Sequence, residues 1–336
     1  MDQKQGKYQN PAMAILTGIK DLFSQKTKAG MVREEDRLDN KNILVTGANS
    51  GLGYATALHL AKRGANIYMA CRSGIPEKGE EIKKISVSRT IWMLQVDLSD
   101  LDSIESLVKK ITARKLEFDT IICNAAMVPR QSRETKQGLE EMFTVNYLAK
   151  YMLIRRLLDN NCIRTGQSQR SRIIFISSES HRNPEAFDWQ NFGLYQPYGM
   201  GKTVELYGYY KLLLTTFARE LSRRQRLSGV SVFALCPGPV NTRIAREAPW
   251  VIQPILKLIF AIFFRSPMKA AETVVYFATS PDFENISFDY LHLMTRKEID
   301  PMAADPENGR KLWELSEKLL EGFHIRLGQN QKSDMD

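Results

Sequence analysis

The sequence of 336 residues contains only four cysteines and four histidines. Cys71, Cys123, Cys162 and Cys236 lack the short, regular intervals of metal ligands or of a disulfide framework. Three of them lie in or beside apolar strand-like runs, where free cysteine packs as a small hydrophobic residue. The sequence therefore predicts no metal site. It also predicts an intracellular, reducing location, either cytoplasmic or at a membrane surface such as that of the endoplasmic reticulum.

Long hydrophobic runs are also missing. A membrane-spanning helix needs about 18 consecutive apolar residues, and the most apolar stretch, 249–264, is interrupted by Gln253 and Lys257. The chain does not open with a basic region followed by an apolar one, so the sequence shows no secretory signal. Any membrane contact is predicted to be peripheral.

Basic residues exceed acidic ones by 47 to 38, which gives a formal net charge of +9. They are spread along the whole chain, whereas a nucleic-acid-binding protein gathers them on one face. An anionic cofactor or an anionic membrane surface explains the same charge. We therefore expect no nucleic-acid partner.

The pattern of the chain changes near residue 41. Residues 1–40 are polar except over 12–23, where apolar side chains recur at helical spacing. This short amphipathic helix packs on the domain, or else lies on a membrane or a partner. We expect a single domain over 41–322, including a substrate-covering segment at 243–266, and a polar tail over 323–336.

From residue 41, short apolar runs alternate with helical segments. We expect strands over 42–46, 66–71, 91–96, 120–123, 173–177 and 230–236, with a weaker one near 288–293. Helical spacing is clearest over 52–62, 103–112, 139–158 and 205–226. Strands that are apolar throughout and alternate with helices form parallel sheets covered on both faces. The sequence predicts an α/β class, a doubly wound Rossmann fold with a mostly parallel seven-stranded sheet.

The first predicted strand leads directly into a glycine-rich segment and then a helix. Glycine permits the tight turn and the close approach of the backbone to a phosphate. The helix N-terminus offers N–H groups and a positive dipole end to a dinucleotide pyrophosphate. The strand–turn–helix context supports this prediction more than the glycines do. The candidate cofactor-binding residues here are Gly47, Asn49, Ser50, Gly51, Leu52 and Gly53.

The second predicted strand ends at Cys71, and Arg72 follows it. An NAD site places Asp or Glu at this point to bind the ribose 2′-hydroxyl, but the first carboxylate here is that of Glu77. A guanidinium suits a 2′-phosphate through charge-assisted, paired hydrogen bonds. The sequence predicts NADP(H) in preference to NAD(H).

Further motifs follow in order, each after a predicted strand or in the next helix. They are Asp97-Leu98, Asn124-Ala125-Ala126, Val145-Asn146, Ser177-Ser178 and the segment 237–242. Together with the glycine spacing, this ordered set resembles the short-chain dehydrogenase/reductase superfamily over residues 40–320. Segments 46–49, 70–72, 177–182 and 311–317 are most similar to its retinol dehydrogenase-like branch. One departure is Ala126, where the family usually has glycine.

The superfamily's catalytic pair is a tyrosine with a lysine four residues later on the same helix face. Two pairs fit, Tyr198 with Lys202 and Tyr207 with Lys211. One proline and two glycines surround the first pair, so that segment predicts a turn or the approach to a helix. A leucine-rich helix follows the second pair, and Tyr207 precedes Pro237 by 30 residues, as in the family. We assign Tyr207 and Lys211.

The resemblance implies a role for each candidate catalytic residue, Asn146, Ser178, Tyr207 and Lys211. Tyr207 exchanges a proton with the substrate oxygen, its pKa lowered by Lys211 and by oxidised nicotinamide. Ser178 hydrogen-bonds that oxygen, Lys211 also binds the ribose, and Asn146 holds a water that links Lys211 to solvent. Tyr207 and Lys211 are also candidates for binding the cofactor. The remaining cofactor-binding candidates are Asp97, Leu98, Asn124, Ala125, Pro237, Gly238, Val240 and Thr242.

These features predict an NADP(H)-dependent oxidoreductase that interconverts a lipophilic alcohol and its aldehyde or ketone, retinoid-, steroid- or lipid-like. The apolar stretch 249–264 would cover the substrate, although it also suits a membrane-dipping helix or a homodimer core. One alternative is a catalytically idle NADP(H)-binding regulatory or scaffold protein, which the complete catalytic set disfavours. The other is a sugar-nucleotide epimerase, which the glycine spacing disfavours.

Overall fold

The computed structural model describes residues 30–33, 35–88, 90–166, 170–238 and 266–333. The predicted helix 12–23 and the apolar stretch 249–264 lie outside the described residues. So do two predicted cofactor-binding residues, Val240 and Thr242.

One sheet forms the centre of the fold, with the strand order β3-β2-β1-β4-β5-β6-β7-β8. The strands are β1 (Asn42–Thr46), β2 (Asn66–Cys71), β3 (Ile91–Gln95), β4 (Thr120–Cys123), β5 (Ser171–Ile176), β6 (Val230–Cys236), β7 (Phe288–His292) and β8 (Thr295–Arg296). The first seven are parallel, and the strand order reverses beside β1, as in a doubly wound Rossmann fold. The predicted fold class is confirmed. The sheet has eight strands rather than seven, because two residues after β7 pair with it antiparallel, and no apolar run marks so short a strand.

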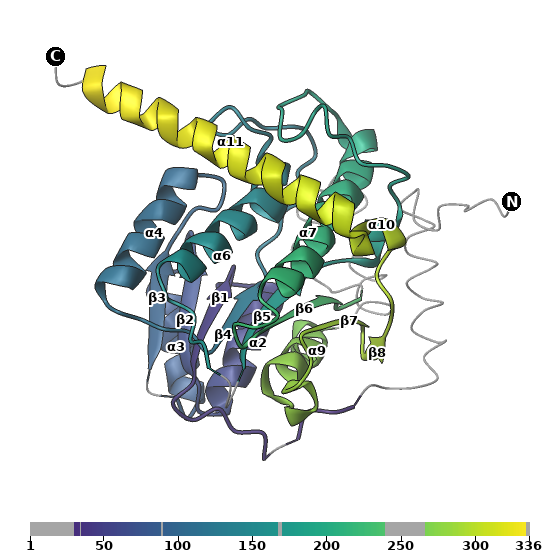
Figure 1. Cartoon of the computed structure of the whole chain (residues 1–336). Helices are drawn as coiled ribbons and strands as arrows, with labels where there is room; N and C mark the ends of the chain where they lie inside the picture. The colour runs from purple at the N-terminus through teal and green to yellow at the C-terminus, as the bar shows by residue number, and fades with distance from the viewer. Residues whose placement is uncertain (1–29, 34, 89, 167–169, 239–265, 334–336) are drawn as a thin grey trace, which may run out of the picture.

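Helices cover both faces of this sheet (Figure 1). On one face lie α2 (Gly51–Lys62), α3 (Glu77–Ile85) and α9 (Pro267–Thr279), and on the other α4 (Leu101–Ala113), α6 (Ala149–Asp159) and α7 (Met200–Arg224). The shorter elements are α5 (Glu141–Phe143), η1 (Thr144–Leu148), η2 (Glu179–Arg182), η4 (Pro281–Phe283) and α10 (Pro301–Ala304). The last helix, α11 (Pro306–Ser333), crosses α7 on the outer side (Figure 1).

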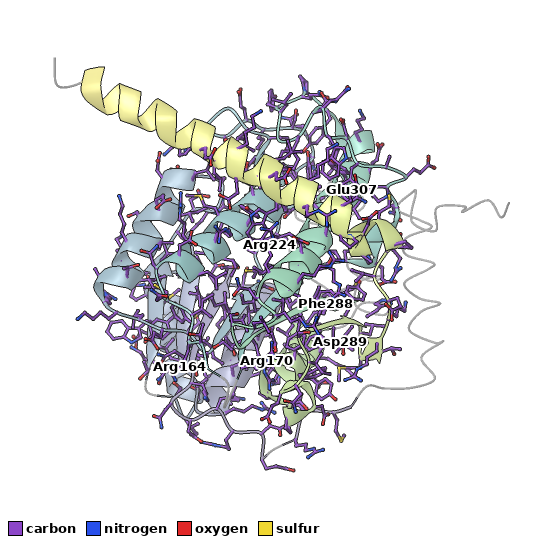
Figure 2. All side chains as sticks on the ribbon, in the orientation of Figure 1. Arg164, Arg170, Arg224, Phe288, Asp289 and Glu307 are labelled. Atoms are coloured by element: carbon purple, nitrogen blue, oxygen red, sulfur yellow. The ribbon has the colours of Figure 1, made fainter. Side chains whose placement is uncertain are left out.

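Each parallel strand contributes to two hydrophobic cores. In β1, Leu44 packs into the core beneath α4, α6 and α7, whereas Ile43 and Val45 pack into the core beneath α2 and α9. The alternation follows because successive side chains of a strand point to opposite faces. Figure 2 shows side chains filling the space on both sides of the sheet. Because both faces of these strands are buried, their sequences are apolar throughout.

A cluster of aromatic rings fixes α7 between the sheet and α11. The ring of Phe217 on α7 lies 4.9 Å from that of Tyr151, 5.5 Å from Phe175 on β5 and 5.9 Å from Trp313 on α11, measured between centroids. The guanidinium of Arg224, labelled in Figure 2, lies 4.1 Å from the centre of the Trp313 ring. Helix α7 is therefore packed on both sides along its second half.

We predict that Phe217→Ala lowers the free energy of unfolding by about 3–5 kcal/mol, since it leaves a cavity where four elements meet. Urea denaturation followed by circular dichroism measures the change. Leu227→Ala is the control, because Leu227 is 93% exposed and its loss should change stability by less than about 0.5 kcal/mol. Equal effects of the two substitutions would contradict this account of the core.

A buried histidine joins η2 to α10. Nδ1 of His181 donates to the carbonyl oxygen of Ser178 at 2.6 Å, and Nε2 accepts from the N–H of Asp300 at 3.1 Å. One ring nitrogen donates and the other accepts, so His181 is neutral. Burial lowers the pKa of His181 to about 4, and the charge of Arg182 acts in the same direction.

This shift predicts a loss of stability in acid. The unfolded chain takes up a proton near pH 6.5, the ordinary histidine pKa, whereas folded His181 does so only near its pKa of about 4. The free energy of unfolding should therefore fall as the pH drops between those values, by at most about 3 kcal/mol. Urea denaturation across this window should show a smaller pH slope for His181→Asn than for the unmodified chain. Identical slopes would refute the assignment.

Candidate active site

The parallel register brings the carboxyl ends of the strands to one edge of the sheet. Thr46, at the end of β1, pairs with β2, and Cys71, at the end of β2, pairs with Gln95 of β3. The glycine loop, Arg72 and Asp97 follow these strand ends. Residues separated by about 50 positions therefore meet at one edge, as parallel pairing requires.

The glycine loop between β1 and α2 is a tight turn. Gly47 and Gly51 have φ values of +66° and +56°, a conformation that favours glycine. A Cβ atom on Gly53 would lie 2.3 Å from the carbonyl oxygen of Gly47, so no side chain fits there. The amide of Asn124 donates to the carbonyl oxygens of Thr46 at 3.0 Å and of Gly47 at 3.3 Å. Asn124 thus supports the loop through its side chain.

The start of α2 fits a phosphate group. Ser50 is the N-cap, yet its side chain makes no capping hydrogen bond, and the first turn contains no acidic residue. The first N–H groups of a helix have no partner within the helix, and the dipole places positive potential beside them. Glycines and uncapped N–H groups together fit the pyrophosphate of a dinucleotide.

Polar groups line the neighbouring strand ends. The amide of Asn49 donates to the carbonyl and hydroxyl oxygens of Ser73, both at 3.1 Å. The side chain of Arg72 is 64% exposed, and its guanidinium lies 3.8 Å from a carboxylate oxygen of Asp97, too far for a hydrogen bond. The other oxygen of Asp97 accepts from the N–H and hydroxyl of Ser99. Arg72 and Asp97 are thus joined by a long ion pair and not by a hydrogen bond.

Ser178 and Tyr207 meet at the end of β5. The hydroxyl oxygen of Ser178 accepts from the N–H of Ser180 at 3.2 Å and from its hydroxyl at 2.8 Å. Its own proton is therefore available for the hydrogen bond with Tyr207. Burial raises the pKa of Tyr207 above its usual range, the nearby Cys236 raises it further, and a side-chain hydrogen bond with Ser178 lowers it. The sequence predicted a lowering by Lys211 together with oxidised nicotinamide, whereas in the protein alone burial has the largest effect on this pKa.

Lys211 lies one helical turn from Tyr207 on the same face of α7. Its amine is 5.4 Å from the centre of the Tyr207 ring and donates to the carbonyl oxygen of Ile176 at 2.7 Å. The side chain is 1% exposed. Burial lowers the pKa of Lys211 to about 8, and Cys236 acts in the opposite direction.

Asn146 lies in the π-helical turn η1, which breaks the single helix predicted over 139–158 into α5, η1 and α6. Its side chain accepts from the N–H of Met127 at 2.9 Å and donates to the Met127 carbonyl oxygen at 2.8 Å. Its own carbonyl oxygen accepts from the amine of Lys150 at 2.8 Å. The sequence analysis missed Lys150. The available signal was a lone lysine inside an apolar helical run.

Tyr198 and Lys202 do not share a helix face. Helix α7 begins at Met200, so Tyr198 precedes it, as predicted from the proline and glycines. The Tyr198 hydroxyl donates to a carboxylate oxygen of Glu140 at 2.7 Å, and burial raises the pKa of Tyr198 above its usual range. Both residues of the pair line a cavity of about 600 Å³ that neither Ser178 nor Tyr207 lines.

Two further predicted residues follow β6. Pro237 is buried, and Gly238 has a φ of +75°, with the side chain of Leu293 only 2.3 Å from where a Cβ would lie. In the part of the chain that the structure describes, no group of His, Cys, Asp and Glu is arranged to hold a metal ion. Nor do the described helices include one with the length and apolar character needed to cross a membrane.

Comparison with known proteins agrees with this geometry. Residues 41–190 match the family model described as short chain dehydrogenase. Mouse retinol dehydrogenase 13 is 33% identical over 89% of this chain and 89% of its own length. Bovine dehydrogenase/reductase SDR family member 13 is 30% identical over 94% of this chain and 81% of its own length.

Solved structures share the fold. A crystal structure of an uncharacterised protein from Mycobacterium paratuberculosis superposes with a TM-score of 0.64 and 26% identity, covering 85% of this chain and 95% of the other. The Pseudomonas aeruginosa RhlG/NADP active-site complex superposes with a TM-score of 0.60 at 16% identity, covering 78% and 98%. The chain is thus an oxidoreductase of the short-chain dehydrogenase/reductase superfamily and belongs to its retinol dehydrogenase-like branch.

Proposed function

We propose that this oxidoreductase uses NADP(H) to interconvert a lipophilic alcohol and its aldehyde or ketone, with Tyr207 as general acid and base. The observation that carries the proposal is the meeting of the Tyr207 phenol, the Ser178 hydroxyl and the Lys211 amine at one strand end. These groups come from η2 and α7, far apart in sequence. Surface tyrosine–lysine pairs have no such partners.

Each of these side chains has a distinct task. When substrate binds, the Ser178 hydroxyl donates its proton to the substrate oxygen in place of Tyr207 and so orients the reacting carbon. In reduction Tyr207 gives a proton to that oxygen, and in oxidation it takes one away. Bound NADP(H) supplies or accepts the hydride. The positive charge on Lys211 stabilises the Tyr207 phenolate, which opposes the effect of burial.

Arg72 supports the choice of NADP(H). It follows β2 at the position where an acidic residue would bind the ribose 2′-hydroxyl. Its guanidinium is exposed and makes only a long ion pair with Asp97. A 2′-phosphate would offer it shorter, charge-assisted hydrogen bonds. The neighbouring Asn49 and Ser73 are hydrogen-bonded to each other.

The proposed substrate class rests on two observations. The relatives named retinol dehydrogenase point to a lipophilic alcohol. The sequence of 249–264 is strongly apolar and lies in the segment that covers the substrate in this superfamily. A catalytically idle regulatory protein is the competing proposal, and the complete set of Asn146, Ser178, Tyr207 and Lys211 favours an enzyme.

We predict that Tyr207→Phe lowers kcat/KM by about 10²- to 10⁴-fold, since it removes the general acid. The assay follows NADPH oxidation with a panel of lipophilic aldehydes and ketones, retinal among them. Tyr198→Phe is the matched control and should change kcat/KM by less than about threefold. Both variants should bind NADPH as the unmodified chain does, measured by quenching of tryptophan fluorescence. Loss of activity in Tyr198→Phe alone would reverse the assignment.

We predict that Arg72→Gln raises the Kd for NADPH by about 10- to 100-fold, because it removes a charge-assisted pair of hydrogen bonds to the 2′-phosphate. The Kd for NADH should stay within about threefold, because NADH has no phosphate there. Fluorescence titration measures both. Arg310→Gln, an exposed arginine on α11, is the control. If NADPH affinity survives the Arg72 substitution, the preference for NADP(H) is wrong.

A further inference from the structure

A buried carboxylate follows Ser178 directly in the chain. Glu179, in η2, is 6% exposed, and carboxylates are seldom buried to this extent unless they are paired. One of its oxygens accepts a hydrogen bond from the hydroxyl of Tyr290 at 2.8 Å. The other accepts from the amine of Lys297 at 3.1 Å and lies 3.4 Å from Nε of Arg182. The side chain of Glu179 is therefore held at both oxygens.

Two of these partners come from strands that do not adjoin β5. Glu179 follows β5, whereas Tyr290 lies in β7 and Lys297 follows β8. Strand β6 lies between β5 and β7 (Figure 1), and neighbouring strands are about 4.8 Å apart. The contact therefore spans the end of β6, where the thiol of Cys236 has a backbone hydrogen bond with Glu179. Glu179 thus joins three neighbouring strands near their carboxyl ends.

The carboxylate of Glu179 is ionised. Burial by itself raises the pKa of Glu179, but the nearby groups His292, Arg182 and Lys297 lower it, and the pKa is brought down to about 2. At neutral pH the hydrogen bond from Lys297 is therefore charge-assisted, and such bonds are about twice as strong as neutral ones. This attraction holds η2 against the end of β7.

The η2 turn is fastened on two further sides. The guanidinium of Arg182 donates to the carbonyl oxygen of Glu298, after β8. On the side of α7, a Cβ on Gly208 would lie 2.8 Å from the carbonyl oxygen of Ser180. Glycine at this position lets the backbone of η2 approach α7 next to Tyr207. The turn is thus enclosed between the catalytic face of α7 and the residues after β7.

We propose that Glu179 is a positioning residue of the catalytic centre. Held by Tyr290 and Lys297, it fixes the η2 turn and with it the direction of the Ser178 side chain. Ser178 is the N-cap of η2 and has an extended backbone, with φ −158° and ψ 150°, so the residue after it determines where the hydroxyl points. A displacement of about 1 Å in such a group can lower a rate about 100-fold. The inference rests on the proposed role of Ser178.

The first test compares two buried glutamates in the NADPH oxidation assay. Glu179→Gln keeps the size of the side chain but removes its charge. It should lower kcat about tenfold, while KM for the carbonyl substrate and the Kd for NADPH stay within about threefold. Glu220→Gln is the matched control, because Glu220 is 5% exposed and paired with Arg223 and Arg224. It lies about 20 Å along α7 from Tyr207, so kcat should stay within about twofold.

The second test distinguishes positioning from a general loss of structure. Ser178→Ala alone should lower kcat about 10²- to 10³-fold. Because Glu179 acts through Ser178, adding Glu179→Gln to Ser178→Ala should lower kcat by less than about twofold more. Tyr290→Phe removes one donor and leaves the carboxylate and Lys297 in place, and it should show the same pattern with a smaller loss. Circular dichroism establishes folding, and Tyr290→Phe alone decides the test if Glu179→Gln does not fold.

Each contrary result has a separate meaning. A full tenfold further loss in the double variant, or an equal loss in Glu220→Gln, would show a general structural effect and overturn the inference. Normal kcat in both Glu179→Gln and Tyr290→Phe, with Ser178→Ala impaired, would also overturn it and leave the proposed function standing. If Ser178→Ala kept full activity, the proposed role of Ser178 would fail and the inference with it.

Discussion

The hydrogen bond from the Lys211 amine to the carbonyl oxygen of Ile176, at 2.7 Å, joins helix α7 to the end of β5. It requires a long cationic side chain to leave water without a carboxylate partner, which costs free energy. The packing of α7 around Phe217 holds the helix in place despite that cost. The face of α7 that carries Tyr207 is therefore kept against the strand end from which Ser178 emerges.

The last part of the chain supports this geometry from outside. Helix α11 packs its Trp313 against Phe217 and Arg224 of α7. The backbone of Asp300, just before α10, donates to His181, and His181 in turn binds the carbonyl oxygen of Ser178. Contacts from α10 and α11 thus help to determine where Ser178 and α7 lie.

The π-helical turn links the same centre to α6. The side chain of Asn146 in this turn bonds to the backbone of Met127, and the amine of Lys150, at the start of α6, donates to the carbonyl oxygens of Val145 and Asn146. The contacts of one turn thus fix the position of Asn146.

The sequence by itself determined the fold class and the glycine loop, and it placed Tyr198 before the helix that carries Tyr207. These follow from local rules, because apolar strands, glycine turns and helix-breaking residues act over a few positions. It did not reveal β8, the break in the helix over 139–158, or the burial of Lys150. A two-residue strand depends on its neighbour, and a π-turn keeps the same apolar spacing as an α-helix. The dominant effect of burial on the pKa of Tyr207 was likewise decided only by tertiary structure, because desolvation depends on the packing of elements distant in sequence.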